Sequence, residues 1–286
     1  MSLPILLSVF AIPSISIPFV YLAGKKSPKA AAIFVALIAL LNIALVMYTV
    51  PTILSNGSYQ EEYTWIPTII NTQFTLYVDG ISASVALISL VLIFVASLFS
   101  VNYMAGKKHL AAYYALLCML SVGLIGVFLT SNMILFYFCW ELMLVPAYFI
   151  VGEWGYRNSY KSALKLFIFT HAGAVFVLLG IGAVYWLTDS TDMFVAQSAL
   201  MTAAPDIVKW ILIALTAGFA VKMAVFPVHM WLPDAHSEAP APMSALLSGV
   251  IISAGAYAIL RLSFGMVFPS VGITFGTDFL HVLSIF

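Results

Sequence analysis

Charged residues are scarce in this sequence of 286 residues. Asp, Glu, Lys and Arg together make up 8% of it, whereas 63% of the residues are hydrophobic. Soluble domains carry about 25% charged residues, so the composition excludes a soluble protein and indicates an integral membrane protein. The formal net charge is +0, and the lack of a basic patch argues against a nucleic-acid partner.

Cysteine is also nearly absent. Cys118 and Cys139 are the two cysteines of the chain, and both lie within apolar segments. This placement argues against a disulfide framework or a metal cluster and favours two small buried hydrophobic side chains. No other residue pattern indicates a redox centre, so we expect no cofactor and no metal in this chain.

The N-terminus lacks the basic region and the small-residue cleavage site of a signal peptide, so we expect it to begin a transmembrane helix. A helix needs about 20 apolar residues to cross a bilayer. By this measure the sequence predicts an all-α integral membrane protein with eight helices, at residues 2–23, 30–54, 78–104, 109–130, 132–153, 162–187, 207–231 and 240–266. The segments 55–75 and 188–205 are then the longer connections.

The few charged residues alternate in sign from one loop to the next. Basic residues follow the first, third and fifth predicted helices: Lys25, Lys26, Lys29, Lys107, Lys108, Arg157 and Lys161. Acidic residues occupy opposite loops: Glu61, Glu62, Asp189 and Asp192. Because basic loops favour the cytoplasm, the pattern predicts a multi-pass protein of a cell membrane with both termini on the outer side.

Two charged residues lie inside predicted helices, and each is followed five residues later by proline. Glu141 precedes Pro146, and Lys222 precedes Pro227. Ionisable side chains at membrane depth are costly and commonly serve ion or proton movement. Each proline also frees the carbonyl four residues before it, here those of Leu142 and Met223, beside the ionisable group. The pattern predicts two hydrated, proton-active positions.

The segments around these residues resemble a known family. The matching stretches are 78–82 (VDGIS), 138–146 (FCWELMLVP), 165–170 (KLFIFT), 219–229 (FAVKMAVFPVH) and 231–240 (WLPDAHSEAP). They are similar to the antiporter-like subunits shared by respiratory complex I, membrane-bound hydrogenase-type complexes and multisubunit cation/proton antiporters. The similarity is greatest to the N-terminal half of the M-type, proton-translocating subunit.

The resemblance implies a fold of about fourteen helices in two inverted five-helix repeats, each with a discontinuous helix. We expect this chain to hold an N-terminal three-helix segment (1–105), the first repeat with a broken seventh helix (106–268), and the start of a next helix (269–286). That last segment is too short to span a bilayer. Either the chain is a fragment, or another polypeptide supplies the next helix and the second repeat, or the segment lies at the interface.

The family's motif also assigns roles, with one departure. It places Glu141, Lys222 and Lys165 in an ion-translocation row, but the lysine usual in the eighth helix is replaced by Ser253 within 249–257 (GVIISAGAY). Serine cannot carry a charge near neutral pH, although it can hydrogen-bond to water. His229 and His236, beside the helix break, are the candidate substitutes for proton relay, as histidine changes charge near neutral pH.

Other polar residues have simpler interpretations. We expect Asp234 and Glu238 to cap helix ends near Ser237 and Ser244. Arg261, late in the eighth helix, is expected to extend outward to the interface. His171, one to two helical turns beyond Lys165, is a weaker candidate for a place in the Lys165 pocket.

The resemblance leads to one functional hypothesis with two alternatives. The chain would be a membrane-arm subunit of a prokaryotic complex I-like or hydrogenase-like respiratory complex, moving H⁺ or Na⁺ through a Glu141/Lys222 ion-pair switch. Partner subunits would supply a peripheral redox arm with Fe–S clusters and, in hydrogenase-like complexes, a Ni–Fe centre, so whether the chain belongs to an enzyme depends on them. The alternatives are a subunit of a stand-alone multisubunit cation/proton antiporter and a structural spacer that no longer pumps.

Overall fold

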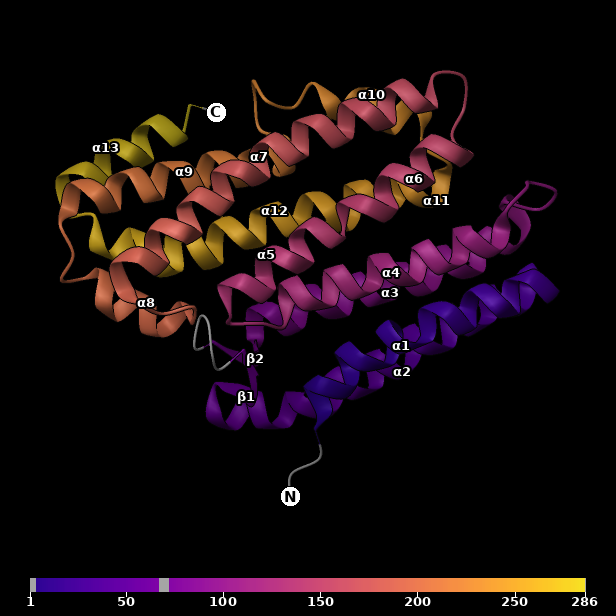
Figure 1. Ribbon diagram of the computed structural model, residues 1–286, viewed down its shortest axis with the longest axis horizontal. Helices are drawn as coiled ribbons and strands as arrows, with labels where there is room; N and C mark the ends of the chain where they lie inside the picture. Colours follow the sequence, from indigo (N-terminus) through magenta and orange to yellow (C-terminus); the bar gives the residue numbers. More distant parts are fainter. Residues whose placement is uncertain (1–3, 67–71, 286) are drawn as a thin grey trace.

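The computed structural model describes residues 4–66 and 72–285, and long helices packed side by side make up most of it (Figure 1). The predicted start of the first helix at residue 2 lies outside the described residues. The main helices are α1 (Ile5–Lys26), α2 (Pro28–Asn56), α3 (Gly80–Tyr103), α4 (Leu110–Phe128), α5 (Met133–Leu142), α6 (Leu144–Trp154), α7 (Ser159–Thr188), α9 (Pro205–Met223) and α12 (Ile252–Ala258). Buried apolar side chains from all of them form one continuous core.

In the part of the chain that the structure describes, seven segments are long and apolar enough to cross a membrane. They are α1, α2, α3, α4 and α7, the combined α5 and α6 over Met133–Trp154, and a final segment over Ala241–Ser270. The remaining predicted span contains α9, which differs in carrying Asp206, Lys209 and Lys222 within its 19 residues. The prediction of a helical, multi-pass membrane fold is confirmed.

The predicted seventh helix is broken. Instead of continuing to residue 231, α9 ends at Met223, where Ala224 adopts a left-handed conformation with φ of 59°. A short irregular segment that contains Pro227 follows, and the chain becomes helical again in α10 (Trp231–Glu238). The indole Nε1 of Trp231 donates a hydrogen bond to the carbonyl of Val221 at 2.8 Å, so a side chain from beyond the break satisfies an acceptor at the end of α9.

The last membrane segment also departs from a regular helix. It consists of α11 (Ala241–Leu246), the π-helical turns η1 (Leu247–Ile251) and η2 (Ile259–Val267) on either side of α12, and a final 3₁₀ turn η3 (Phe268–Ser270). Single π-helical turns within helices are often found at functional sites. Beyond them, α13 (Ile273–Leu283) has 11 residues, too few to span a bilayer.

Both longer connections contain regular structure that the sequence did not reveal. Residues of the 55–75 connection form an antiparallel hairpin of β1 (Ser58–Ile66) and β2 (Thr72–Asp79), so the third helix begins at Gly80 and not at residue 78. The 188–205 connection contains α8 (Met193–Leu200), whose first turn is capped by Asp192.

The hairpin is fixed to the start of α1 by Glu61. Its carboxylate accepts hydrogen bonds from the backbone amides of Leu6 and Leu7, each at 3.0 Å, and from the hydroxyls of Tyr59 and Tyr63. Burial and the neighbouring Glu61 carboxylate raise the pKa of both tyrosines to about 12. A carboxylate at a helix N-terminus interacts favourably with the positive end of the helix dipole and stabilises the helix. Glu61 therefore has a structural role.

Two glycines allow α7 and α9 to cross closely. A Cβ atom on Gly218 would lie 2.6 Å from the carbonyl oxygen of Gly173, and a Cβ on Gly173 would lie 2.9 Å from that of Gly218. Small residues at such crossings let helix backbones approach in membrane proteins. This contact brings α9, with Lys222 in its last turn, against α7.

We predict that Gly218→Ala will lower the thermal stability of the protein in detergent, at a cost of about 1–3 kcal/mol, because the atoms that block the new methyl group include rigid backbone. Gly182→Ala is the matched control on α7, since a Cβ there meets nothing within 4 Å. Equal thermal stability of the two variants would contradict this account of the crossing.

Candidate functional site

Lys222 is a buried cation at the helix break. Its exposed fraction is 3%, and its ammonium group donates a hydrogen bond to the backbone carbonyl of Trp140 at 2.8 Å. The same group lies 4.0 Å from the centre of the Trp140 ring, close enough for a cation–π interaction. Trp140 in turn packs against Phe136 and Phe219. The Lys222 ammonium group at the end of α9 thus lies against Trp140 of α5, the residue before Glu141.

The Glu141 carboxylate contacts a different residue. Its Oε2 atom lies 2.8 Å from Nδ1 of His171 on α7, and the imidazole stacks on Phe167 with ring centres 5.6 Å apart. The side chains of His171 and Glu141 are 49% and 25% exposed. Within the described residues Glu141 has no ion pair with Lys222, so the predicted direct contact is not formed in this structure. Lys222 contacts the backbone beside Glu141 instead.

Lys165 pairs with Asp234 across the gap between α7 and α10. The ammonium and carboxylate oxygen are 2.6 Å apart, and the side chains are 33% and 51% exposed. His171, the weaker candidate for this pocket, contacts Glu141. The prediction that Asp234 caps a helix end is wrong, because its carboxylate pairs with Lys165 and α10 has no side-chain cap. Glu238 acts at a different helix end from the one predicted, because its carboxylate accepts the backbone amide of Asn158, the residue before α7, at 2.9 Å.

The two candidate relay histidines lie on either side of Trp231. His229 packs against Phe226 in the irregular segment, and its Nδ1 is buried without a hydrogen-bond partner among the described residues. Nδ1 of His236 lies 2.8 Å from Oγ of Ser244, beside a cavity of about 370 Å³ that both residues line. His229 therefore has an unused nitrogen at the helix break, and His236 lies beside an open surface cavity.

Ser253 does not join these groups. Its hydroxyl donates to the carbonyl of Gly249 in the same helix, at 3.1 Å. Hydrogen bonds of this kind are common for serine in membrane helices. The backbone of Met223, by contrast, is close to the final segment, because a Cβ on Gly255 would lie 2.8 Å from the Met223 amide nitrogen. The helix break therefore lies against α12, within one turn of Ser253.

Arg261 corrects another expectation. Instead of extending to the interface, its Nη2 atom lies 2.7 Å from both carboxylate oxygens of Asp79. Asp79 also accepts the Ser82 amide and caps α3. Burial opposes ionisation of Asp79, but the Ser82 hydrogen bond and the Arg261 guanidinium outweigh it and hold the pKa of this carboxyl below its usual range. The pair joins η2 to the start of α3.

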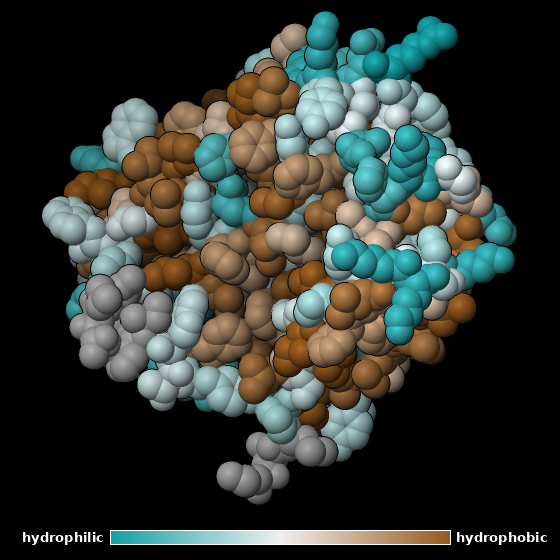
Figure 2. All heavy atoms as spheres, turned by 45° about the vertical axis from the view of Figure 1, so that its right-hand side comes forward, coloured by the Kyte–Doolittle hydropathy of each residue, from teal (hydrophilic) through white to brown (hydrophobic). Residues whose placement is uncertain are grey.

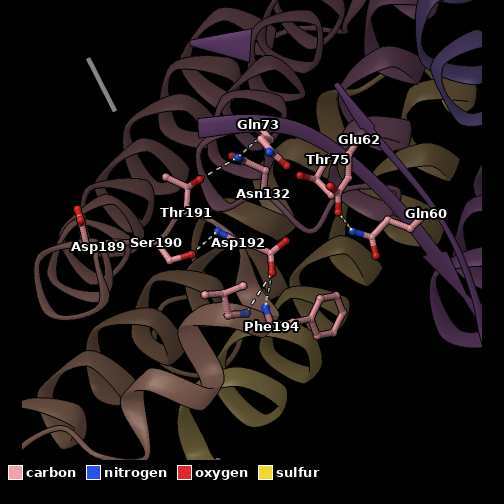
Figure 3. Close-up of a pocket in the computed structure, with 11 residues that line it drawn as sticks. Gln60, Glu62, Gln73, Thr75, Asn132, Asp189, Ser190, Thr191, Asp192 and Phe194 are labelled. Atoms are coloured by element: carbon pink, nitrogen blue, oxygen red, sulfur yellow. Dashed lines mark hydrogen bonds between the residues drawn. The ribbon is translucent and has the colours of Figure 1, made fainter. Parts of the chain in front are cut away.

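Figure 3 shows a polar cavity of about 420 Å³ between the hairpin and the α7–α8 connection. Asn132 lies at its centre and donates to Thr72, to Thr191 and to the carbonyl of Gln73. Asp192 accepts from Ser131 and from two amides of α8. These groups satisfy one another and hold the loops together. Nowhere in residues 4–66 and 72–285 do three or more His, Cys, Asp or Glu side chains form a group suited to a metal ion.

The sequence motifs indicate Glu141, Lys222 and Lys165 but not their partners. Neither the contact of His171 with Glu141 nor that of Trp140 with Lys222 was predicted, because contacts between separate helices leave no spacing signal in the sequence. Trp231 could have been noted, since an indole N–H at membrane depth requires an acceptor.

A family model and several curated proteins match this chain, and they agree on one family. The family described as NADH:quinone oxidoreductase/Mrp antiporter, TM matches residues 130–286. NAD(P)H-quinone oxidoreductase chain 4-2 of Synechocystis sp. is 33% identical over 267 residues, covering 92% of this chain and 47% of the relative. NADH-quinone oxidoreductase subunit M of Rickettsia conorii is 35% identical over 276 residues, covering 92% and 54%.

A solved structure shares the fold. A chain of the membrane-bound sulfane sulfur reductase, an archaeal respiratory membrane complex, superposes with a TM-score of 0.81 at 22% identity, over 97% of this chain and 56% of that one. The chain spans about half the length of the relatives that it matches. Because the family match covers more than half of the sequence, this chain belongs to the NADH:quinone oxidoreductase/Mrp antiporter family of transmembrane proteins.

Proposed function

We propose that this chain forms part of an H⁺ or Na⁺ pathway in the membrane arm of a prokaryotic respiratory complex, driven by electron transfer in partner subunits. The observation that carries the proposal is the placement of Lys222. A buried ammonium group at the end of an interrupted helix is held by one carbonyl and one aromatic face, next to an ionisable glutamate. Such groups in membrane helices mark ion and proton pathways.

The proposed switch has two arrangements. In the one observed, Glu141 pairs with His171 and Lys222 contacts the Trp140 carbonyl. In the other, the Glu141 carboxylate turns to the Lys222 ammonium. An ion pair at about 4 Å is worth about 4 kcal/mol at an effective dielectric constant near 20, which corresponds to about a thousandfold change in proton affinity. Breaking this pair would release the lysine proton, and forming it would favour reloading.

The other charged and polar groups extend the pathway along the bundle. Lys165 and Asp234 form the next ion pair, between α7 and α10. His229, whose buried Nδ1 has no partner among the described residues, and His236, beside a cavity, would carry protons between the helix break and water. Ser253 would contribute a hydrogen bond to water and no charge.

Orientation and partners are part of the same proposal. Basic residues of the loops after α1, α3 and α6 gather at one end of the bundle (Figure 1), which comes forward with hydrophilic side chains in Figure 2. We place this end in the cytoplasm and both termini outside. The partners would be other antiporter-like membrane subunits, a peripheral arm that carries Fe–S clusters, and any polypeptide that carries the second repeat.

Two alternatives have some support. The family includes Mrp antiporters as well as quinone oxidoreductases, which keeps a stand-alone cation/proton antiporter open. The hydrogen bond that keeps Ser253 within its own helix is what a non-pumping spacer would also show. Mass spectrometry of the complex purified in mild detergent separates the redox pump from the exchanger, because subunits with Fe–S clusters favour the pump and antiporter subunits alone favour the exchanger.

We predict that Glu141→Gln will reduce ion translocation by about a hundredfold, the scale of a lost acid–base group. The amide keeps the shape of the side chain but cannot take up a proton. Translocation would be measured with a fluorescent pH indicator in inverted membrane vesicles that contain the assembled complex. Glu153→Gln is the control in the same membrane segment, on the exposed end of α6. Normal translocation by Glu141→Gln would exclude the switch.

A further inference from the structure

We infer that His171 is the residue that exchanges protons with Glu141. His171 would then set the charge of the carboxylate that attracts the Lys222 ammonium group. This inference rests on the proposed function and assigns a role to a residue outside the motif segments that carry the family resemblance. It is carried by the contact between Nδ1 of His171 and Oε2 of Glu141 at 2.8 Å.

His171 lies well inside a long membrane helix. It is the thirteenth residue of the 30-residue helix α7, about 18 Å from the helix start at 1.5 Å per residue. The contact between His171 and Glu141 at that depth is not buried in this chain, since the two side chains are 49% and 25% exposed. A structural hydrogen bond would be served better by an uncharged pair, because half-exposed ionisable groups in a membrane are costly.

The two imidazole nitrogens of His171 differ in their hydrogen-bond contacts. Nδ1 faces Glu141, whereas Nε2 has no hydrogen-bond partner among the residues that the structure describes. Phe167 stacks on the ring nearly parallel, at 11°, and holds its orientation. One nitrogen is thus directed to the carboxylate, and the other is left without a partner among the described residues.

The neighbouring ionisable groups have other contacts. On α5, Tyr137 lies near Glu141, and on α6, Tyr148 packs against Phe167. Lys165 of α7 is paired with Asp234 of α10, and Lys222 of α9 is held by Trp140. The helix α8 contains no ionisable residue. Glu141 is therefore the charged group that His171 contacts directly.

In the proposed step one proton passes from water through His171 to Glu141. A hydronium ion gives a proton to Nε2, and the Nδ1 proton passes to Oε2 of Glu141. Water and a neutral imidazole remain on one side, and a neutral carboxylic acid on the other. A neutral Glu141 no longer attracts the Lys222 ammonium. Protonation of Glu141 through His171 would then decide when Lys222 releases its proton. Return of the proton from Glu141 to His171 would restore the negative charge of the carboxylate.

The test uses variants that separate proton transfer from hydrogen bonding. His171→Asn places an amide donor near the position of Nδ1 but cannot transfer a proton, whereas His171→Ala removes both functions. We expect His171→Asn to lower translocation by at least about a hundredfold, the lower end of acid–base contributions, and to flatten its dependence on pH. Thermal stability should stay unchanged. His281→Asn, on the exposed face of α13, is the matched control.

Translocation would be driven in separate experiments by the electron donor of the complex and by an imposed cation gradient. Normal rate and pH profile in His171→Asn, with translocation lost in Lys222→Ala and Glu141→Gln, would overturn the role of His171 and leave the proposed function intact. If all three variants translocate normally, the proposed function fails and this inference with it.

A spectroscopic measurement covers the case in which His171→Asn does not assemble. In the otherwise wild-type complex labelled with ¹⁵N-histidine, the imidazole resonance of His171 should change when Glu141→Gln is introduced. An unchanged resonance would overturn direct proton exchange between the two residues.

Discussion

Lys222→Ala is expected to abolish ion translocation in the assembled complex while leaving the subunit in place. The variant removes the ammonium group of α9 that contacts the Trp140 carbonyl of α5, and no other lysine or arginine among the described residues contacts that part of α5. Without Lys222 the proposed second arrangement, in which Glu141 pairs with this ammonium, cannot form. A pair worth about 4 kcal/mol corresponds to about a thousandfold change in proton affinity. Translocation in inverted vesicles should fall below detection.

A control on the same helix makes the result specific. Lys209 also lies on α9, but it pairs with the 90% exposed Asp206 three residues away, and exposed pairs contribute little. Lys209→Ala should therefore translocate normally. If Lys222→Ala translocates at the wild-type rate, the chain does not pump through this site and the spacer interpretation is favoured.

Arg261→Leu is expected to cause a large loss of stability, because it breaks a mostly buried ion pair. Asp79 and Arg261 are 17% and 14% exposed, and the variant leaves the carboxylate without its partner. Breaking a fully buried pair costs about 3–5 kcal/mol, and the residual exposure lowers this to about 2–3 kcal/mol here. The unfolding temperature in detergent should fall by about 5 to 10 °C.

A double-mutant cycle tests the cause of this loss. Asp79→Asn removes the acceptor charge but keeps a group that can cap α3 through Ser82. The double variant Asp79→Asn, Arg261→Leu should be more stable than the sum of the two single losses predicts, because neither charge is then left unpaired. Strict additivity of the two losses would mean that the ion pair itself contributes nothing.

The resemblance to the family predicts the break in the seventh helix. The class of the protein and the order of its membrane segments follow from composition and from the length of apolar runs, which are local properties that each segment carries alone. For the same reason Glu141 and Lys222 stood out, since a charge within an apolar run is visible without knowing the fold.

The pairing of the charged groups depends on how the helices pack. Glu141 pairs with His171, Lys165 with Asp234 and Arg261 with Asp79, across sequence separations of 30, 69 and 182 residues. Such partners depend on how the helices rotate and cross, as at the two glycines of α7 and α9, and helix periodicity carries no information about the facing helix. The sequence placed the charges at membrane depth, and the packing of the helices selected their partners.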